Sequence, residues 1–128
     1  MRTGAVVVAG VALLVAGCGS GHRPVPPLSQ KSFAAAANRI CAQATTRSGR
    51  LAGLRALRPP SSAADLYGHW LAAERDALVA TRTRATPSAK SELDPAVVLA
   101  IAEGKISGYA RRLGAVTCAM RTIGTMPQ

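Results

Sequence analysis

The cysteines constrain this chain more than any other residues, and the first of them, Cys18, follows a short apolar run. The run extends over residues 5–16 and is preceded by one cation, Arg2. A helix that spans a bilayer needs about 20 apolar residues, so this run is too short for a permanent span. Its length and its charged start are those of a cleavable export signal. We therefore expect residues 1–17 to be a signal peptide and the rest of the chain to be exported.

The residues before Cys18 narrow the kind of signal. Val15-Ala16-Gly17-Cys18 resembles the lipobox of bacterial lipoprotein signal peptides. The resemblance implies that the Cys18 thiol is alkylated with diacylglycerol, that cleavage leaves Cys18 as the first mature residue, and that palmitate is among the acyl groups. Two acyl chains suffice for stable anchoring. We expect a protein anchored on the outer face of the cell membrane; the alternative is an ordinary signal peptide with an incidental cysteine.

Once Cys18 is assigned to the lipid, Cys41 and Cys118 remain, which explains the odd number of cysteines. Two cysteines allow one pairing, and an oxidising compartment favours the bond. A Cys41–Cys118 disulfide closes a loop of about 78 residues and stabilises the fold by about 4–5 kcal/mol in the chain-entropy model. The alternative is two free, buried thiols.

Composition favours one small helical domain. Removal of residues 1–17 leaves 111 of the 128 residues, with 15 cations and 6 acids, so the net charge is +9. Aromatic side chains are few and alanine is frequent, which argues against a sheet and suits closely packed helices. We expect a Gly- and Pro-rich tether over residues 18–28 and a helical domain over residues 29–128.

The first expected helix begins near Ser29 or Ser32, either of which can cap it, and reaches about Ser48. A kinked or broken segment then continues to Leu57, because glycines weaken the pattern before two prolines end it. The apolar residues of the helix recur at helical spacing (Phe33, Ala37, Ile40, Cys41 and Ala44).

Two further helices are expected. Ser62 and Asp65 resemble a capping box at the start of the second, which ends before Pro87. The third begins after Asp94, a good N-cap, and Gly114 is its expected C-cap. Their expected core residues are Leu66, Trp70, Ala73, Ala77, Leu78 and Thr81 in the second, and Val98, Ile101, Ala102, Ile106, Tyr109 and Leu113 in the third, with Lys105 snorkelling among them.

Three main helices with short connections predict an all-α, up-down bundle with one disulfide. In that order the first and third helices run parallel, so their ends lie side by side. Cys118, just beyond the end of the third helix, then lies past the level of Cys41 in the first helix, which makes the disulfide difficult to form. The difficulty is removed if the first helix ends near Ser48, or if the chain reverses after Gly114 so that a last short turn brings Cys118 and Met120 back onto the bundle.

Four segments of the chain are distinctive: the residues from Phe33 to Cys41 (with Ala-Asn-Arg-Ile before the cysteine), Leu54-Arg-Ala-Leu-Arg-Pro-Pro60, Tyr67-Gly-His-Trp-Leu71 and Leu113-Gly-Ala-Val-Thr-Cys118. Together they resemble a group of small helical lipoproteins from high-GC Gram-positive bacteria. The resemblance covers nearly all of the mature chain. It implies a cysteine-paired helical domain and brings no catalytic residues with it.

The sequence offers no clear catalytic, metal or cofactor site. His22 falls in the tether, and His69 shares a possible helix face with Asp65 and Asp76, where we expect an exposed imidazole paired weakly with Asp65. Metal sites normally need three or four ligands from separate elements. Nucleophile-elbow and phosphate-loop motifs are absent from the sequence, and no aromatic platform for nucleic acid is evident.

The sequence therefore predicts a non-enzymatic, lipid-anchored helical protein that binds or scaffolds at the envelope. Its cations suit an anionic lipid surface or a cell-wall polyanion, or they serve only solubility. Candidate ligand or partner contacts are Trp70, Tyr67, Arg111 and Arg112. One alternative is a carrier or sensor of a small apolar or anionic ligand held near Trp70. Another is an envelope enzyme or accessory subunit that uses His69.

Overall fold

A computed structural model describes residues 24–85 and 93–120 of the chain. The expected signal peptide and Cys18 lie outside these ranges. The described residues are helical and contain no strand, so the expected all-α class is confirmed. The helices are α1 (Gln30–Gln43), α2 (Arg47–Arg55), α3 (Ala64–Ala85), α4 (Pro95–Arg112) and α5 (Val116–Met120), with a 3-10 turn, η1 (Ser61–Ala63), before α3.

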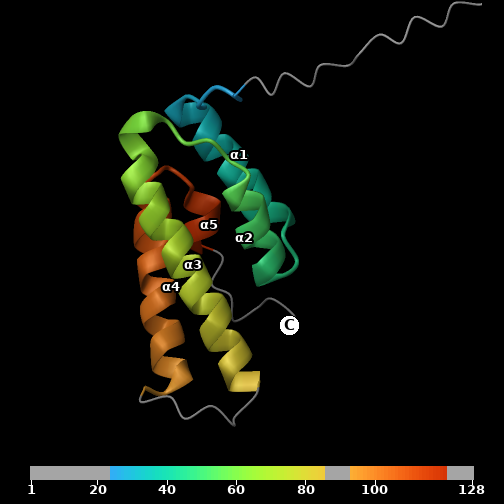
Figure 1. Ribbon diagram of the computed structural model, residues 1–128, viewed down its shortest axis with the longest axis vertical. Coiled ribbons are helices and arrows are strands. Elements are labelled where there is room, and N and C mark those ends of the chain that lie inside the picture. Colours follow the sequence, from blue (N-terminus) through green and yellow to red (C-terminus); the bar gives the residue numbers. More distant parts are fainter. Residues whose placement is uncertain (1–23, 86–92, 121–128) are drawn as a thin grey trace, which may run out of the picture.

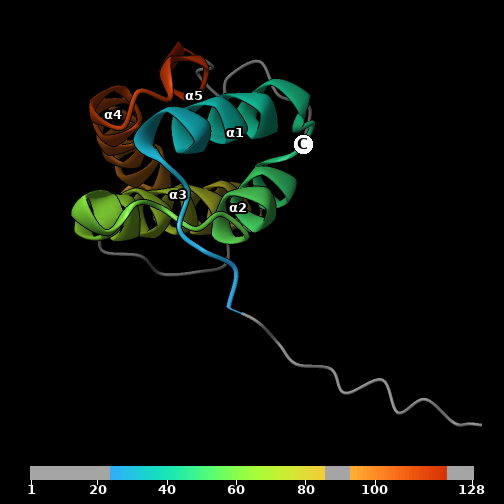
Figure 2. The same ribbon diagram turned by 90° about the horizontal axis from the view of Figure 1, so that it is seen from above.

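The long helices α3 and α4 form an antiparallel pair that extends along the molecule, and this is the most extensive contact between helices (Figure 1). The helices α1 and α2 cover one end of the pair. Figure 2 shows α1 above α2 and α3, with α5 between α1 and α4. The arrangement is an up-down bundle in which the shortest helix, α5, fills the gap beside α1.

The number of main helices differs from the expected three, because the first predicted segment forms two helices. α1 ends at Gln43, and Ala44 takes an extended conformation. The side chain of Thr46 then caps α2, since its Oγ1 accepts a hydrogen bond from the Gly49 N–H at 3.1 Å. Gly53 permits α2 to lie close against α1, because a Cβ there would stand 2.9 Å from Ile40 Cγ2.

The predicted direction of the first helix relative to the last long helix is wrong, because the chain makes an extra reversal between α1 and α2. α1 and α4 run antiparallel, not parallel (Figure 1). The start of α1 therefore lies beside the end of α4, where Gln30 Nε2 donates to the Leu113 carbonyl at 2.9 Å.

The predicted helix starts are confirmed for α4 and wrong for α3. Asp94 Oδ1 accepts a hydrogen bond from the Ala96 N–H at 2.8 Å, and Pro95 occupies the first turn, as expected. Ser62 does not act as an N-cap with Asp65, because it lies inside η1, which follows Pro60.

The core consists of small side chains around three aromatic rings. Phe33 packs edge-on against Tyr67 at 5.2 Å between ring centroids, and Tyr67 packs edge-on against Trp70 at 6.2 Å. The predicted stripes supply half of the eighteen buried apolar residues in the described ranges (Phe33, Ala37, Cys41, Trp70, Ala73, Ala77, Ala102, Ile106 and Leu113). Ile101 and Met120 were expected inside and are instead exposed.

Gly114 reverses the chain between α4 and α5. Its φ of +79° is the only positive φ among the described residues. The C-cap of α4 is Leu113, so Gly114 follows the cap by one residue and does not form it as expected. A Cβ at this position would stand 3.3 Å from the Cβ of Ala34. The reversal sends α5 back beside α1, which is the second of the two geometries that allow the Cys41–Cys118 pairing.

Replacing Gly114 with alanine should lower the free energy of unfolding by about 1–2 kcal/mol, since an L residue with a left-handed backbone conformation is strained. Gly108→Ala is a matched control, because Gly108 lies within α4 and a Cβ there has no atom within 4 Å. That substitution should raise the stability by up to about 1 kcal/mol. Urea unfolding of both variants measures the difference, and equal effects would contradict the role of Gly114.

Candidate functional site

The disulfide between Cys41 and Cys118 is present and joins α1 to α5. The S–S bond is 2.03 Å long, the Cα atoms are 5.2 Å apart and both residues are buried. The sequence separation of 77 residues makes this the longest-range covalent constraint in the described chain. The pairing predicted from the cysteine count is confirmed.

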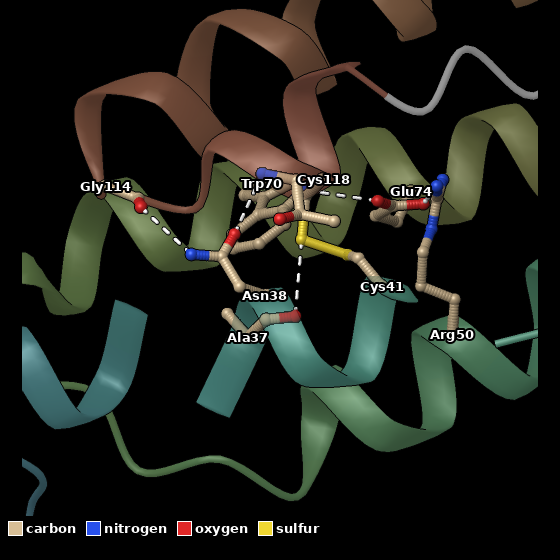
Figure 3. Close-up of a disulfide and its surroundings, with 9 residues drawn as sticks. Ala37, Asn38, Cys41, Arg50, Trp70, Glu74, Gly114 and Cys118 are labelled. Carbon is tan, nitrogen blue, oxygen red and sulfur yellow. Dashed lines mark hydrogen bonds and ion pairs between the residues drawn. A yellow bond between two sulfur atoms is a disulfide. The ribbon is translucent and has the colours of Figure 1, made fainter. Parts of the chain in front are cut away.

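Asn38 connects α1 to the chain reversal before α5. Its Nδ2 donates to the Gly114 carbonyl at 3.4 Å, and its Oδ1 accepts from the Thr117 N–H at 2.9 Å (Figure 3). The second bond satisfies an N–H in the first turn of α5, which has no intrahelical partner. Asn38 and the disulfide therefore hold the short helix in place from the same side.

Beside the disulfide lies a buried ion pair between α2 and α3. Arg50 Nη2 and Glu74 Oε2 are 2.6 Å apart, and both side chains are fully buried (Figure 3). The Trp70 indole N–H donates to the other carboxylate oxygen of Glu74 at 3.2 Å. Glu74 thus accepts from two buried donors, and its charge is matched by one guanidinium.

A second arginine of α2 forms a similar pair with α4. Arg47 Nη2 lies 3.2 Å from Glu103 Oε1, and the Arg47 side chain is 6% exposed. Burial lowers the pKa of the Arg47 guanidinium, and its hydrogen bond to Glu103 opposes that shift. We call Arg47, Arg50, Glu74, Glu103 and Trp70 the buried arginine cluster.

The buried arginine cluster is polar, and its donors are only partly satisfied. Within the described chain, the Nε and Nη1 atoms of Arg47 and Arg50 have no hydrogen-bond partner. Unsatisfied buried donors are unfavourable by about 1–3 kcal/mol each. The two carboxylates neutralise the two guanidiniums, so the cluster as a whole carries no net charge. It therefore depends on every member remaining in place.

The buried arginine cluster was not predicted from the sequence, because all the arginines were expected at the surface. A signal was present: Arg47, Arg50, Leu51 and Leu54 recur at helical spacing, so the leucines place both arginines on the buried face. Glu74 likewise follows Trp70 by four residues, on the face that also carries Ala73 and Ala77. Two opposite charges on two apolar faces indicate a buried pair.

The candidate contact residues do not meet in one site. Trp70 and Tyr67 lie in the core, whereas Arg111 and Arg112 are exposed in the last turn of α4. The Tyr67 hydroxyl donates to the Leu54 carbonyl, and burial raises the pKa of Tyr67 to about 12. This hydroxyl therefore stays protonated at neutral pH.

His69 is exposed, as expected, but its partner is different. Its ring stacks on Tyr109 of α4, with centroids 6.0 Å apart and an interplanar angle of 22°. No ion pair joins His69 to Asp65 in the described residues. Over residues 24–85 and 93–120 there is also no group of three or more residues of the types that ligate metals.

The described surface is strongly cationic, and its exposed acids are found in two places. The described residues include ten exposed cations, found on every helix from α1 to α4 and at Arg58 after α2, and three exposed acids. Asp65 and Asp76 lie on α3, and Asp94 precedes α4. The cations are thus widely spread, and the sides of the bundle differ mainly in where acids interrupt them.

Comparison of the chain with models of protein families, with curated proteins and with solved structures gives no match. Among the helices that the structure describes, none has the length and the apolar character required to cross a membrane.

Proposed function

We propose that this chain is a lipid-anchored protein on the outer face of the cell membrane, and that its helical domain acts by binding or scaffolding rather than by catalysis. The Cys41–Cys118 disulfide is the observation that carries the proposal. Such bonds form and persist in oxidising compartments, so this one supports export. Its two cysteines are committed to each other, which leaves Cys18 as the cysteine available to the lipid.

The chemistry of the described surface supports a binding role. The buried arginine cluster holds two cations and two acids in internal pairs, and the ten exposed cations then face only three exposed acids. A cationic domain held at a membrane is attracted to anionic lipids and to wall polyanions. The carrier and the enzyme are not favoured by the described contacts, because Trp70 donates its N–H to Glu74 and His69 stacks on Tyr109.

Intact-mass analysis of protein extracted from the envelope tests the anchor and the disulfide together. The chain should begin at Cys18 with acyl chains attached, and a reductant should add the mass of two hydrogen atoms after unfolding. Cys18→Ser should move the protein from the membrane fraction to the medium, whereas Ser20→Ala in the same segment should leave it in the membrane fraction. An unacylated chain, or an unchanged distribution of the Cys18 variant, would contradict the proposal.

Binding at the envelope is tested by crosslinking in intact cells. The anchored chain should give a crosslinked product of fixed mass, and the released Cys18→Ser chain should give less of it, because anchoring raises its effective concentration at the envelope. A chain that is anchored yet never crosslinked would contradict the scaffolding role while leaving the anchor in place.

A further inference from the structure

One exposed helix surface combines large aliphatic side chains with cations and no acids. It is the side of α4 that points away from α3 and α5, and Figures 1 and 2 show α4 at the edge of the bundle. We call this surface the outward face of α4, and its residues are Val97, Ala100, Ile101, Gly104, Lys105, Gly108, Arg111 and Arg112.

The first half of the outward face is apolar and open. Val97 is 48% exposed and Ile101 is 52% exposed, although both are large aliphatic residues. Gly104 and Gly108 continue the same stripe, and a Cβ at either position would meet no atom within 4 Å. The helix therefore presents a low, apolar ridge to which a flat surface has access.

The second half of the outward face is cationic. Lys105, Arg111 and Arg112 are all exposed. The acid of this helix, Glu103, lies outside the face and is paired with Arg47. Asp94 precedes the helix, and its carboxylate accepts the N-capping hydrogen bond from Ala96. The long helix next to α4 differs, since the exposed side of α3 mixes Asp65 and Asp76 with arginines.

The position of this face relative to the tether is also informative. Gln30, the first residue of α1, donates to the Leu113 carbonyl at the end of α4. The segment before α1 thus enters the bundle at the same end as the cationic end of α4, and its Leu28 N–H donates to the Arg58 carbonyl at 3.0 Å, on the side of α2 and α3 (Figure 2). Arg111 and Arg112 therefore lie at the end of the bundle to which the tether is attached.

We propose that the outward face of α4 docks on the anionic surface of the bilayer, with Val97 and Ile101 at the level of the headgroups and the three cations against lipid phosphates. The proposal rests on the proposed lipid anchor and adds a second attachment, which lays the domain flat on the membrane. Amphipathic helices with aliphatic and cationic sides bind anionic interfaces in this way. A second copy of the chain fits the face less well, because the three cations of one copy would face the same three cations of the other and repel them. A soluble polyanion leaves the aliphatic ridge unused.

Vesicle binding tests the proposal on the expected mature chain, residues 18–128, with Cys18→Ser, so that neither an acyl group nor the signal peptide contributes. The vesicles contain phosphatidylcholine, with or without phosphatidylglycerol, and the measured quantity is the affinity gained from phosphatidylglycerol. The variant Lys105→Gln/Arg111→Gln/Arg112→Gln should bind about 100-fold more weakly, at about fivefold for each cation near an anionic surface. The control Arg75→Gln/Arg82→Gln/Arg84→Gln removes the same charge from the second half of α3 and should lose less than about tenfold.

The aliphatic part of the face is tested by its own pair of variants, one on α4 and a control on α3. Ile101→Ser should weaken binding about 5-fold, because part of an aliphatic side chain no longer leaves water. Val79→Ser, at a residue of α3 that is 55% exposed, should have no effect.

Three results would overturn the docking. Equal losses in the two triple variants mean that net charge alone attracts the chain. An α4 effect that persists on polyglutamate, with no effect of Ile101→Ser on vesicles, identifies a soluble polyanion as the partner. A dimer in sedimentation equilibrium that Ile101→Ser dissociates identifies a second copy. None of these bears on the acylation of Cys18, which the intact mass measures separately.

Discussion

Glu74→Gln should lower the free energy of unfolding by about 3–5 kcal/mol, which is the largest effect we expect from a single side chain outside the aromatic core. The substitution keeps the size of the side chain and an oxygen that can accept from the Trp70 indole. It removes the negative charge that stands 2.6 Å from the fully buried Arg50 guanidinium. A buried cation without a counter-charge is strongly unfavourable, so the loss should exceed that of the hydrogen bond alone.

The measurement is urea unfolding followed by the fluorescence of Trp70, the one tryptophan of the chain. Trp70 is fully buried, so its emission should shift on exposure to water. Asp76→Asn is the matched control, because it removes one carboxylate charge from an exposed position of the same helix. It should change the stability by no more than about 0.5 kcal/mol.

The double variant Arg50→Met/Glu74→Gln identifies the cause. With both charges gone, the double variant should lose less stability than the two single variants, Arg50→Met and Glu74→Gln, lose in sum. The difference should be about 1–3 kcal/mol in the free energy of unfolding. This variant also keeps the test informative if Glu74→Gln alone does not fold. A Glu74→Gln chain as stable as the Asp76→Asn control, or additive effects in the double variant, would show that the pair is not buried as described.

The parts of the fold that sequence reasoning predicted are those set by local chemistry. Asp94 followed by Pro95 forms a helix start from side-chain and backbone geometry within a few residues, and Gly114 adopts a positive φ because glycine tolerates it. The cysteine pairing was likewise predictable, because the count left one combination. None of these needs knowledge of a distant neighbour.

The parts that were missed depend on contacts between distant segments. Thr46 caps α2 only because the chain turns at Ala44, and this turn changes the direction of α1 relative to α4. The leucines beside Arg50 indicate the face on which it lies, but the carboxylate that neutralises it belongs to Glu74, 24 residues away. Periodicity alone assigned Ile101 to the core, whereas packing against α3 and α5 leaves it on the open side of α4. A stripe of alanines permits several rotations of a helix, so the sequence did not specify this one.

Removing the disulfide with Cys41→Ala/Cys118→Ala should lower the free energy of unfolding by about 4–5 kcal/mol. The bond joins residues 77 apart in sequence, and its absence allows the unfolded chain many more conformations. A single small domain has about 5–15 kcal/mol of stability in total, so this loss leaves a marginal fold. The same urea titration measures it, with Trp70 as the probe.

The slope of the unfolding transition separates this mechanism from a packing defect. If the bond acts through the unfolded state, the variant should expose more surface on unfolding and show a steeper dependence on urea than the parent. The fully reduced parent is the matched control, because it keeps both sulfur atoms and loses only the covalent link. The slope measured for the reduced parent should equal that of the double alanine variant. Its stability should be slightly higher, because its two sulfur atoms still pack in the core.

The disulfide should also decide whether α5 stays in place. A helix of five residues is too short to persist alone in water, and the other described side-chain bond that reaches the start of α5 comes from Asn38. In the alanine variant, hydrogen exchange at the amides of Cys118→Ala and Ala119 should therefore be much faster than at Ile106 in α4. If α5 stays protected while the global stability falls, then its non-covalent contacts suffice to dock it, among them the hydrogen bond that Asn38 accepts from the Thr117 N–H and the one that Ser107 Oγ donates to the Ala119 carbonyl. In that case the disulfide acts on the unfolded chain alone.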